Sequence, residues 1–165
     1  MGKIGLARVD SRLAHSQMVK MWGEKYGLEK VIIANDLTAS DSIRVEVMDL
    51  TVPEEIGSFY LKVAEVGDFL KKNEESYLLL VESTSDLEKI LDQGILDQGI
   101  IEEVNLGIIH LSKGKKSLTD LVALDDEDLR ILKRIKDKGI KISVKKLPED
   151  LDEIDKLGIK LREKY

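Results

Sequence analysis

The chain has 165 residues, and its 32 acidic and 26 basic side chains give a formal net charge of −6. This length predicts one domain spanning residues 1–165, and the negative balance argues against a surface that coats nucleic acid or an anionic membrane. The sequence has no cysteine, which excludes disulfides, thiolate nucleophiles and Cys-based zinc sites, and its only histidines are His15 and His110.

Short, almost wholly apolar runs alternate with longer amphipathic ones along the chain. Apolar runs of this length are typical of strands that are covered on both faces, as in a parallel sheet. The alternation predicts an α/β fold: a single domain with an open, mostly parallel twisted sheet and helices on both faces. The expected strands are residues 4–9, 31–34, 59–63, 77–81, 104–109 and 140–144.

Helices are expected between these strands, over residues 14–26, 41–50, 63–71, 125–138 and 149–156. In residues 41–50 the pattern consists of Ile43, Val47 and Leu50, which recur at helical spacing. The helix at 125–138 has acidic residues at its start and basic residues near its end, and both blocks complement the helix dipole.

Two further local patterns lie between the expected strands at 77–81 and 104–109. The sequence Ser-Asp-Leu-Glu from Ser85 predicts a capping box that opens another helix. The tandem repeat ILDQG, at residues 90–94 and 95–99, predicts a lengthened surface connection between a helix and a strand.

Several classes of ligand and location have no support in the sequence. The motifs G-x-G-x-x-G, G-x-x-x-x-G-K-[ST] and H-E-x-x-H are absent, so we expect no nucleotide, metal or other cofactor. No signal peptide is visible, and the apolar runs are far shorter than the roughly 20 residues that span a bilayer. We therefore expect a cytoplasmic protein.

The segment 8–17, R-V-D-S-R-L-A-H-S-Q, places two arginines and a histidine at the carboxyl end of the first expected strand. Ligands of open parallel sheets bind at this edge, and a helix N-terminus there attracts anions. Arg12 could hold phosphate oxygens, and Asp10 could accept from an imidazole N–H, which leaves the other nitrogen of His15 free to attack. The alternative is a solvated or capping histidine beside a surface ion pair.

This segment resembles the R-[IV]-D-x-R-L-[IVL]-H-G-Q opening of the IIB component of mannose/fructose/sorbose-type sugar phosphotransferase systems. Further segments resemble the same family: Val-Ile-Ile-Ala-Asn-Asp at 31–36, Asn-Leu-Gly-Ile-Ile-His at 105–110, residues 121–139, and Lys-Leu-Pro-Glu-Asp at 146–150. The resemblance covers nearly the whole chain, from about residue 2 to residue 154, and its most specific part is the motif around His15.

The resemblance implies a phosphocarrier enzyme, a phosphotransferase without cofactor. A IIA protein or domain would donate a phosphoryl group to His15, which would pass it to a sugar taken up through the membrane partners IIC and IID. The protein would then associate peripherally with that permease. The resemblance makes His15 the phosphoacceptor and Arg12 the phosphoryl clamp. The supporting residues would be Asp10 and Arg8, which shape the loop, Asn35 and Asp36, which brace it, and Ser83 and Thr84, whose hydroxyls would reach the phosphate.

The sequence departs from the family pattern close to the expected site. Ala14 replaces a bulkier apolar residue, Ser16 replaces Gly, and Ile108 replaces a second Gly. If position 16 needs a positive φ, serine would strain the backbone there, although its hydroxyl could add a phosphate contact. These departures are the reason to keep an alternative open, a catalytically impaired module that senses phosphate or a partner. A weaker alternative is a phosphatase-like enzyme, and we expect His110 to be a strand-end or packing residue.

Overall fold

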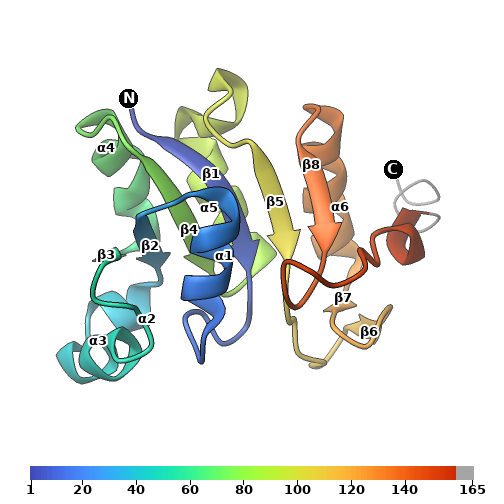
Figure 1. The fold of residues 1–165 in the computed structure, drawn as a ribbon. Helices are drawn as coiled ribbons and strands as arrows, with labels where there is room; N and C mark the ends of the chain where they lie inside the picture. The colour runs from blue at the N-terminus through green and yellow to red at the C-terminus, as the bar shows by residue number, and fades with distance from the viewer. Residues whose placement is uncertain (159–165) are drawn as a thin grey trace.

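The computed structural model describes residues 1–158, in which six parallel strands form one twisted sheet in the order β3-β2-β4-β1-β5-β8 (Figure 1). The neighbouring strands of this sheet are all parallel. The strands are β1 (Lys3–Val9), β2 (Lys30–Ala34), β3 (Gly57–Leu61), β4 (Ser76–Val81), β5 (Glu103–Leu106) and β8 (Lys141–Val144). The predicted α/β class and parallel sheet are confirmed.

Helices cover both faces of the sheet (Figure 1). On one face lies α1 (Met18–Tyr26), whose Met18, Val19 and Trp22 pack against Leu6 and Val31. The opposite face is covered by α4 (Val66–Lys71), α5 (Thr84–Ile90) and α6 (Asp126–Asp137). The shorter elements are α2 (Asp36–Ala39), α3 (Ser42–Asp49), β6 (Lys116–Ser117) and β7 (Ala123–Leu124), of which β6 and β7 form a small antiparallel hairpin.

The predicted helix at 125–138 is confirmed as α6, and its charged ends lie where the sequence predicts them. Asp125 accepts a hydrogen bond from the backbone N–H of Asp128 at 2.8 Å, and Asp128 accepts one from the N–H of Asp125 at 2.9 Å. This capping box satisfies two N–H groups that have no partner inside the helix. Acidic residues fill the first turn, and Arg134 and Lys136 lie in the last.

Other predicted boundaries are wrong. The cap of α5 is Ser83, which accepts from the N–H of Asp86, so the cap lies two residues before the predicted Ser85. Strand β5 ends at Leu106 rather than 109, because the chain leaves the sheet after Leu106. In the predicted helix at 149–156, helical backbone begins only at residue 155. The first helix starts at Met18 instead of residue 14.

The ILDQG repeat does connect a helix with a strand, but it is not wholly at the surface. The two copies form two short turns, η2 (Leu91–Ile95), which contains Gly94, and η3 (Leu96–Gln98), which is followed by Gly99; both glycines have positive φ. The apolar residues of both copies are buried, at Ile90 and Leu91 and again at Ile95 and Leu96. The duplication therefore adds a second turn that packs against the core.

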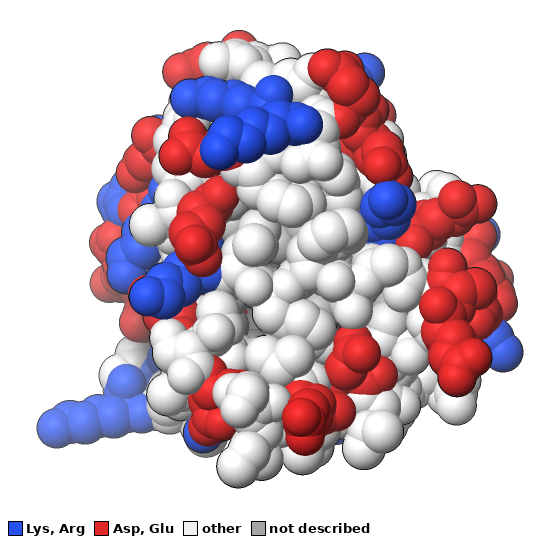
Figure 2. All heavy atoms as spheres, turned by 90° about the vertical axis from the view of Figure 1, so that its left-hand side faces the viewer, with Lys and Arg blue, Asp and Glu red and all other residues white. Residues whose placement is uncertain are grey.

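The apolar stripe that predicts a helix at 41–50 does not face the core. The helix is present as α3, but Ile43 is 70% exposed, Val47 61% and Leu50 85%. Figure 2 views the molecule from the side of β3 and α3 and shows a broad uncharged area bordered by charged side chains. Large exposed apolar areas on soluble proteins often mark sites of interaction with a partner.

Candidate functional site

The loop between β1 and α1 holds the predicted site residues in a tight and partly strained turn. Asp10 follows β1 directly and is fully buried, and its backbone N–H donates to the carbonyl of Val81 at 2.9 Å. Leu13 (φ 58°) and Ser16 (φ 49°) take left-handed backbone conformations. Such conformations cost side chains roughly 1–2 kcal/mol, which glycine avoids. Position 16 thus needs the positive φ that the family's glycine would supply freely.

The carboxylate of Asp10 accepts three hydrogen bonds that tie the loop together. Its Oδ1 accepts from the backbone N–H of Arg12 at 2.9 Å, and its Oδ2 accepts from Nη2 of Arg8 at 3.0 Å. Nε2 of His15 lies 2.9 Å from the same Oδ2. An ionised carboxylate only accepts hydrogen bonds, so Nε2 carries the proton and Nδ1 of His15 has the free lone pair. The hydrogen bond that sequence reasoning expected between Asp10 and the imidazole is present.

Arg8 is buried beneath this loop. Its Nη1 donates to Asn105 Oδ1 at 2.7 Å and to the carbonyl of Lys145 at 3.1 Å, and its guanidinium lies 5.2 Å from the ring centre of Trp22. Desolvation by burial lowers the pKa of Arg8 more than the neighbouring Asp10 raises it. The group stays cationic at neutral pH because the ordinary pKa of arginine lies above about 12. Arg8 therefore compensates the buried charge of Asp10 and does not face solvent.

His15 and Arg12 are the accessible members of the cluster. The His15 side chain is 20% exposed, and that of Arg12 is 41% exposed, with its Nε 3.9 Å from Asp10 Oδ1. The first turn of α1 has no acidic residue, and its cap, Gln17, makes no side-chain hydrogen bond. The N-terminus of α1 thus adds positive potential beside the histidine, as the sequence predicted, although the helix begins three residues after His15.

A groove of about 340 Å³ lies against His15. Its residues come from the loop and from α3 and the turn after it: Ala14, His15, Ser16, Ile43, Arg44, Val47, Met48 and Thr51. Ile43 and Val47 of the exposed stripe therefore form one wall of the groove that holds the candidate phosphoacceptor. The small side chain of Ala14 lies in the same groove.

Asn35 and Asp36 lie two strands away from His15, because β4 separates β2 from β1. Asn35 caps α2 through the N–H and hydroxyl of Thr38, and Asp36 accepts from the N–H of Val63 at 2.8 Å. These bonds stabilise the end of β2 and the entry to α2. They do not reach the His15 loop, so Asn35 and Asp36 do not brace that loop directly, although this was expected of them.

The hydroxyls of Ser83 and Thr84 are used at helix starts. Ser83 accepts from Asp86 as the cap of α5, and buried Thr84 donates to Asp128 Oδ1 at 2.5 Å. The structure disagrees with the predicted phosphate contact of Thr84, because the hydroxyl of Thr84 donates its proton to Asp128 of α6. His110 is exposed, and its backbone N–H donates to Ser11 Oγ at 3.1 Å.

Sequence reasoning missed the residues that hold Arg8. Asn105 was part of a matching motif but had no assigned role, and Ser143 and Trp22 were not considered as site residues. A buried asparagine within an otherwise apolar strand was the available signal. Ser143 gave no comparable signal in the sequence, because a single serine does not mark a buried site.

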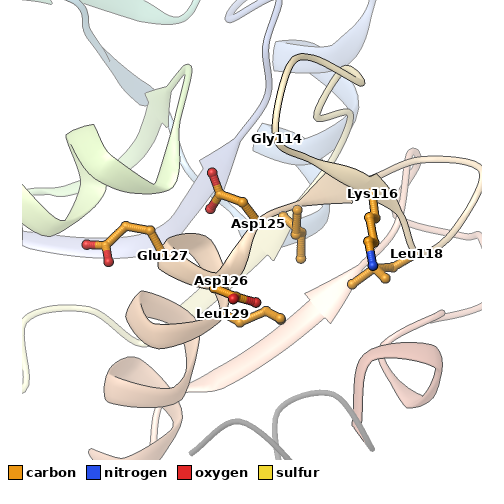
Figure 3. A pocket seen from close by; sticks show the side chains of 8 residues that line it. Gly114, Lys116, Leu118, Asp125, Asp126, Glu127 and Leu129 are labelled. Carbon is orange, nitrogen blue, oxygen red and sulfur yellow. The ribbon is translucent and has the colours of Figure 1, made fainter.

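A second cavity, of about 500 Å³, lies between the β6–β7 hairpin and the start of α6 (Figure 3). Asp125, Asp126 and Glu127 border it, and Lys116 is on its opposite side. Carboxylates repel a phosphoryl group, so this cavity does not suit the chemistry predicted for the chain. Residues 1–158 hold no group of three or more histidines and carboxylates placed to bind a metal ion.

An α/β domain with a carboxylate-bound histidine and an arginine at the carboxyl edge of its parallel sheet fits a histidine phosphocarrier. Residues 4–164 match the family described as the sorbose-subfamily IIB component of the phosphotransferase system (PTS). The chain belongs to this family. The resemblance read from the sequence is thereby confirmed: the chain is a IIB component of the sorbose subfamily.

Relatives and solved structures agree with this placement. The N-acetylgalactosamine-specific phosphotransferase enzyme IIB component 1 of Escherichia coli K12 is 27% identical over 90% of this chain and 93% of its own length. The mannose-specific EIIAB component of the same strain is 28% identical over 89% of this chain, which spans only 45% of that relative. The crystal structure of the E. coli N-acetylgalactosamine-specific IIB component 1 superposes with a TM-score of 0.82 at 27% identity, covering 92% of this chain and 98% of that one.

Proposed function

We propose that His15 accepts a phosphoryl group at Nδ1 from a phosphohistidine of a IIA protein or domain and then transfers it to a sugar. The observation that carries this proposal is the 2.9 Å contact between His15 Nε2 and buried Asp10, because it leaves Nδ1 as the nucleophile. The names of the relatives, which include IIB components for several sugars, support the general reaction.

In the first transfer, the lone pair of Nδ1 attacks the phosphorus of the donor's phosphohistidine. The P–N bond to the donor breaks as the P–Nδ1 bond forms, and the donor ring leaves with the electron pair. The proton on Nε2 stays in place, so the phosphorylated ring of His15 carries positive charge. Asp10 stabilises that charge as the carboxylate of a catalytic triad stabilises an imidazolium.

The transferred group carries negative charge that the loop must also stabilise. Arg12 is accessible and lies beside Asp10, where its guanidinium can hold two phosphoryl oxygens. The N-terminus of α1 contributes its dipole, and the hydroxyl of exposed Ser16 is a further donor in the same groove. Positioning and electrostatic stabilisation of this kind account for most catalysis of phosphoryl transfer.

In the second transfer, a sugar hydroxyl attacks phosphorus and the P–Nδ1 bond breaks, which returns a neutral imidazole with its proton on Nε2. The hydroxyl's proton passes to water or to a base of the partner. The membrane subunits IIC and IID would present the sugar, and the chain would associate peripherally with them. Residues 1–158 contain no helix that is both long and apolar enough to cross a membrane.

The alternative is a module that keeps the fold but only senses phosphate or a partner. The observation that favours it is Ser16 at φ 49°, where the backbone is strained beside the acceptor. A sensing module would bind the IIA partner without acquiring phosphate.

The deciding experiment incubates the protein with a phosphorylated mannose-type IIA protein and the system's general phosphotransfer proteins. We expect acid-labile phosphate on His15, an undiminished signal in His110→Ala and none in His15→Ala. Stoichiometric binding without phosphate on the wild type would favour the sensing module. Phosphate that persists in His15→Ala would contradict the proposal.

A further inference from the structure

Three polar side chains lie side by side across the sheet just below the His15 loop. Arg8 of β1 is the register partner of Asn105 of β5, which is in turn the partner of Ser143 of β8. In-register residues of neighbouring strands point to the same face. All three are at most 1% exposed, and we call them the polar rung.

The polar rung is a continuous chain of hydrogen bonds. Ser143 Oγ accepts from Asn105 Nδ2 at 3.0 Å, which turns the amide oxygen toward Arg8, and that oxygen accepts from Arg8 Nη1 at 2.7 Å. Arg8 Nη2 then donates to the Asp10 oxygen that contacts His15. This series of hydrogen bonds thus connects β8, through β5 and β1, with the imidazole of His15.

The residues around Arg8 pack closely against its guanidinium. A Cβ at position 107 would lie 2.3 Å from Arg8 Cζ, so Gly107 leaves space for the guanidinium. Trp22 packs on the guanidinium and donates from its indole to the carbonyl of Lys146 at 3.3 Å. Nε of Arg8 has no hydrogen-bond partner among the described residues. Burying an unsatisfied donor is costly. The site therefore holds the guanidinium in one orientation although one of its N–H groups stays unpaired.

We propose that the polar rung selects which nitrogen of His15 is phosphorylated. Ser143 and Asn105 act as positioning residues: they hold Arg8, Arg8 fixes the Asp10 carboxylate, and Asp10 keeps Nε2 protonated and turned away from the donor. This inference rests on the proposed phosphorylation of His15 and assigns roles to residues outside its loop. Without the rung, the less hindered Nε2 becomes available to the phosphoryl donor.

The test compares Asn105→Leu and Ser143→Ala with Gln93→Leu in a His110→Ala background, where His15 is the only histidine. Gln93 is the matched control because its amide also bonds at both ends, donating to the carbonyl of Val63 and accepting from the N–H of Gly67, on the opposite face of the sheet from α1. Its loss should lower stability without moving His15. Ser143→Ala serves where Asn105→Leu does not fold, because it removes one hydroxyl and leaves Asn105 in place.

The first measurement is the ¹⁵N-histidine NMR spectrum of the unphosphorylated proteins. We expect a slowly exchanging Nε2-bound proton in the background protein and in Gln93→Leu, with broadening in Ser143→Ala and loss in Asn105→Leu. Folding is checked by the cooperativity of thermal unfolding. A background protein that lacks this proton signal, or a folded Asn105→Leu variant that keeps it, would overturn the inference whether or not the protein accepts phosphate.

The second measurement uses potassium phosphoramidate as a small phosphoryl donor and ³¹P NMR to separate the two phosphohistidine isomers. The background protein and Gln93→Leu should give the Nδ1 isomer alone, and the rung variants a mixture with Nε2. Unchanged isomer ratios in both rung variants would reject the role of the rung. Failure of the IIA protein to phosphorylate the wild type would reject the proposed function and leave the NMR result standing.

Discussion

Asp10 is the residue on which the candidate site depends most. It is fully buried and receives hydrogen bonds from the side chain of Arg8, the backbone of Arg12 and the imidazole of His15. A carboxylate in this position fixes a tautomer and stabilises positive charge, and it needs its own charge compensated by Arg8. Fixing the tautomer requires a hydrogen-bond acceptor, whereas stabilising positive charge requires an ionised oxygen.

We expect Asp10→Asn to reduce phosphoryl transfer to His15 by at least about a hundredfold, since the equivalent change in a catalytic triad costs about 10⁴. Stability should also fall by roughly 3–5 kcal/mol, because the variant leaves the charge of Arg8 buried without its partner. Rapid-quench transfer assays and denaturant unfolding measure the two effects. Asp137→Asn, an exposed change at the end of α6, is the control. Equal transfer rates for Asp10→Asn and the control would contradict the role of the charge.

For Ser16 we predict a substitution that raises stability. Its φ of 49° costs a side chain roughly 1 kcal/mol that glycine avoids, so Ser16→Gly should raise the melting temperature by about 2–4 °C. Ala at the same position keeps the strain and removes only the hydroxyl. If transfer falls in both variants, the hydroxyl contacts the phosphoryl group; if it changes only in Ser16→Gly, backbone strain controls the rate. No stabilisation in Ser16→Gly would show that the loop relieves the strain elsewhere.

At the scale of single elements, the sequence was informative where local forces decide. Charge blocks and a reciprocal cap define α6, and they act within a few residues of the chain. The late start of α1 was missed because Leu13 and Ser16 adopt positive φ, which neither residue type signals. The β6–β7 hairpin was missed because two-residue strands carry no detectable alternation.

Helix α3 shows that a correctly predicted helix does not reveal which way its apolar stripe faces. Ile43, Val47 and Leu50 have helical spacing, but spacing alone does not say whether the stripe faces the core or a partner. In the structure, all three side chains are exposed, and Ile43 and Val47 form a wall of the His15 groove. For the proposed transfer to His15, we expect the protein donor to contact this wall.

We expect Val47→Asp to raise the KM for a phosphorylated IIA protein about tenfold, equivalent to about 1.4 kcal/mol of lost binding. Phosphorylation by phosphoramidate should be unchanged, because a small donor needs no docking surface. Leu151→Asp is the matched control, since Leu151 is 90% exposed but does not line the groove. Equal KM values for the two variants would show that the donor approaches from another side.

At the scale of the molecule, strand order decides what the sequence could reveal. Arg8, Asp10, Arg12 and His15 are local in sequence, so the motif predicted their proximity. Asn105 and Ser143 join Arg8 only because β5 lies between β1 and β8 in one register. No periodicity or propensity encodes that adjacency. The alternation of apolar and amphipathic runs predicted the fold class, whereas the hydrogen bonds across the sheet required the structure.

A second buried network links distant parts of the chain and makes stability depend on pH. Asp128 of α6 accepts from Thr84 at the start of α5 and from Lys115 at 2.7 Å in the segment before β6. Burial by itself would raise the pKa of Asp128, but the hydrogen bonds from Lys115, Thr84 and the backbone of Asp125 outweigh it and lower the pKa. A carboxyl whose folded pKa is lowered stabilises the fold above its unfolded pKa, about 3.9, and that contribution disappears as the pH falls through the folded value.

We therefore expect Asp128→Asn to lower stability at pH 7 by about 1–3 kcal/mol, which corresponds to a melting temperature several degrees lower. The gap between wild type and variant should stay constant from pH 6 to 8 and narrow below about pH 5, where the wild type loses the contribution of the carboxylate. Calorimetric scans across this range measure it, with the exposed Glu24→Gln as control. A gap that persists unchanged at pH 3 would mean that the ionised carboxylate contributes nothing, and that Asp128 joins α5, α6 and Lys115 through its shape and neutral hydrogen bonds alone.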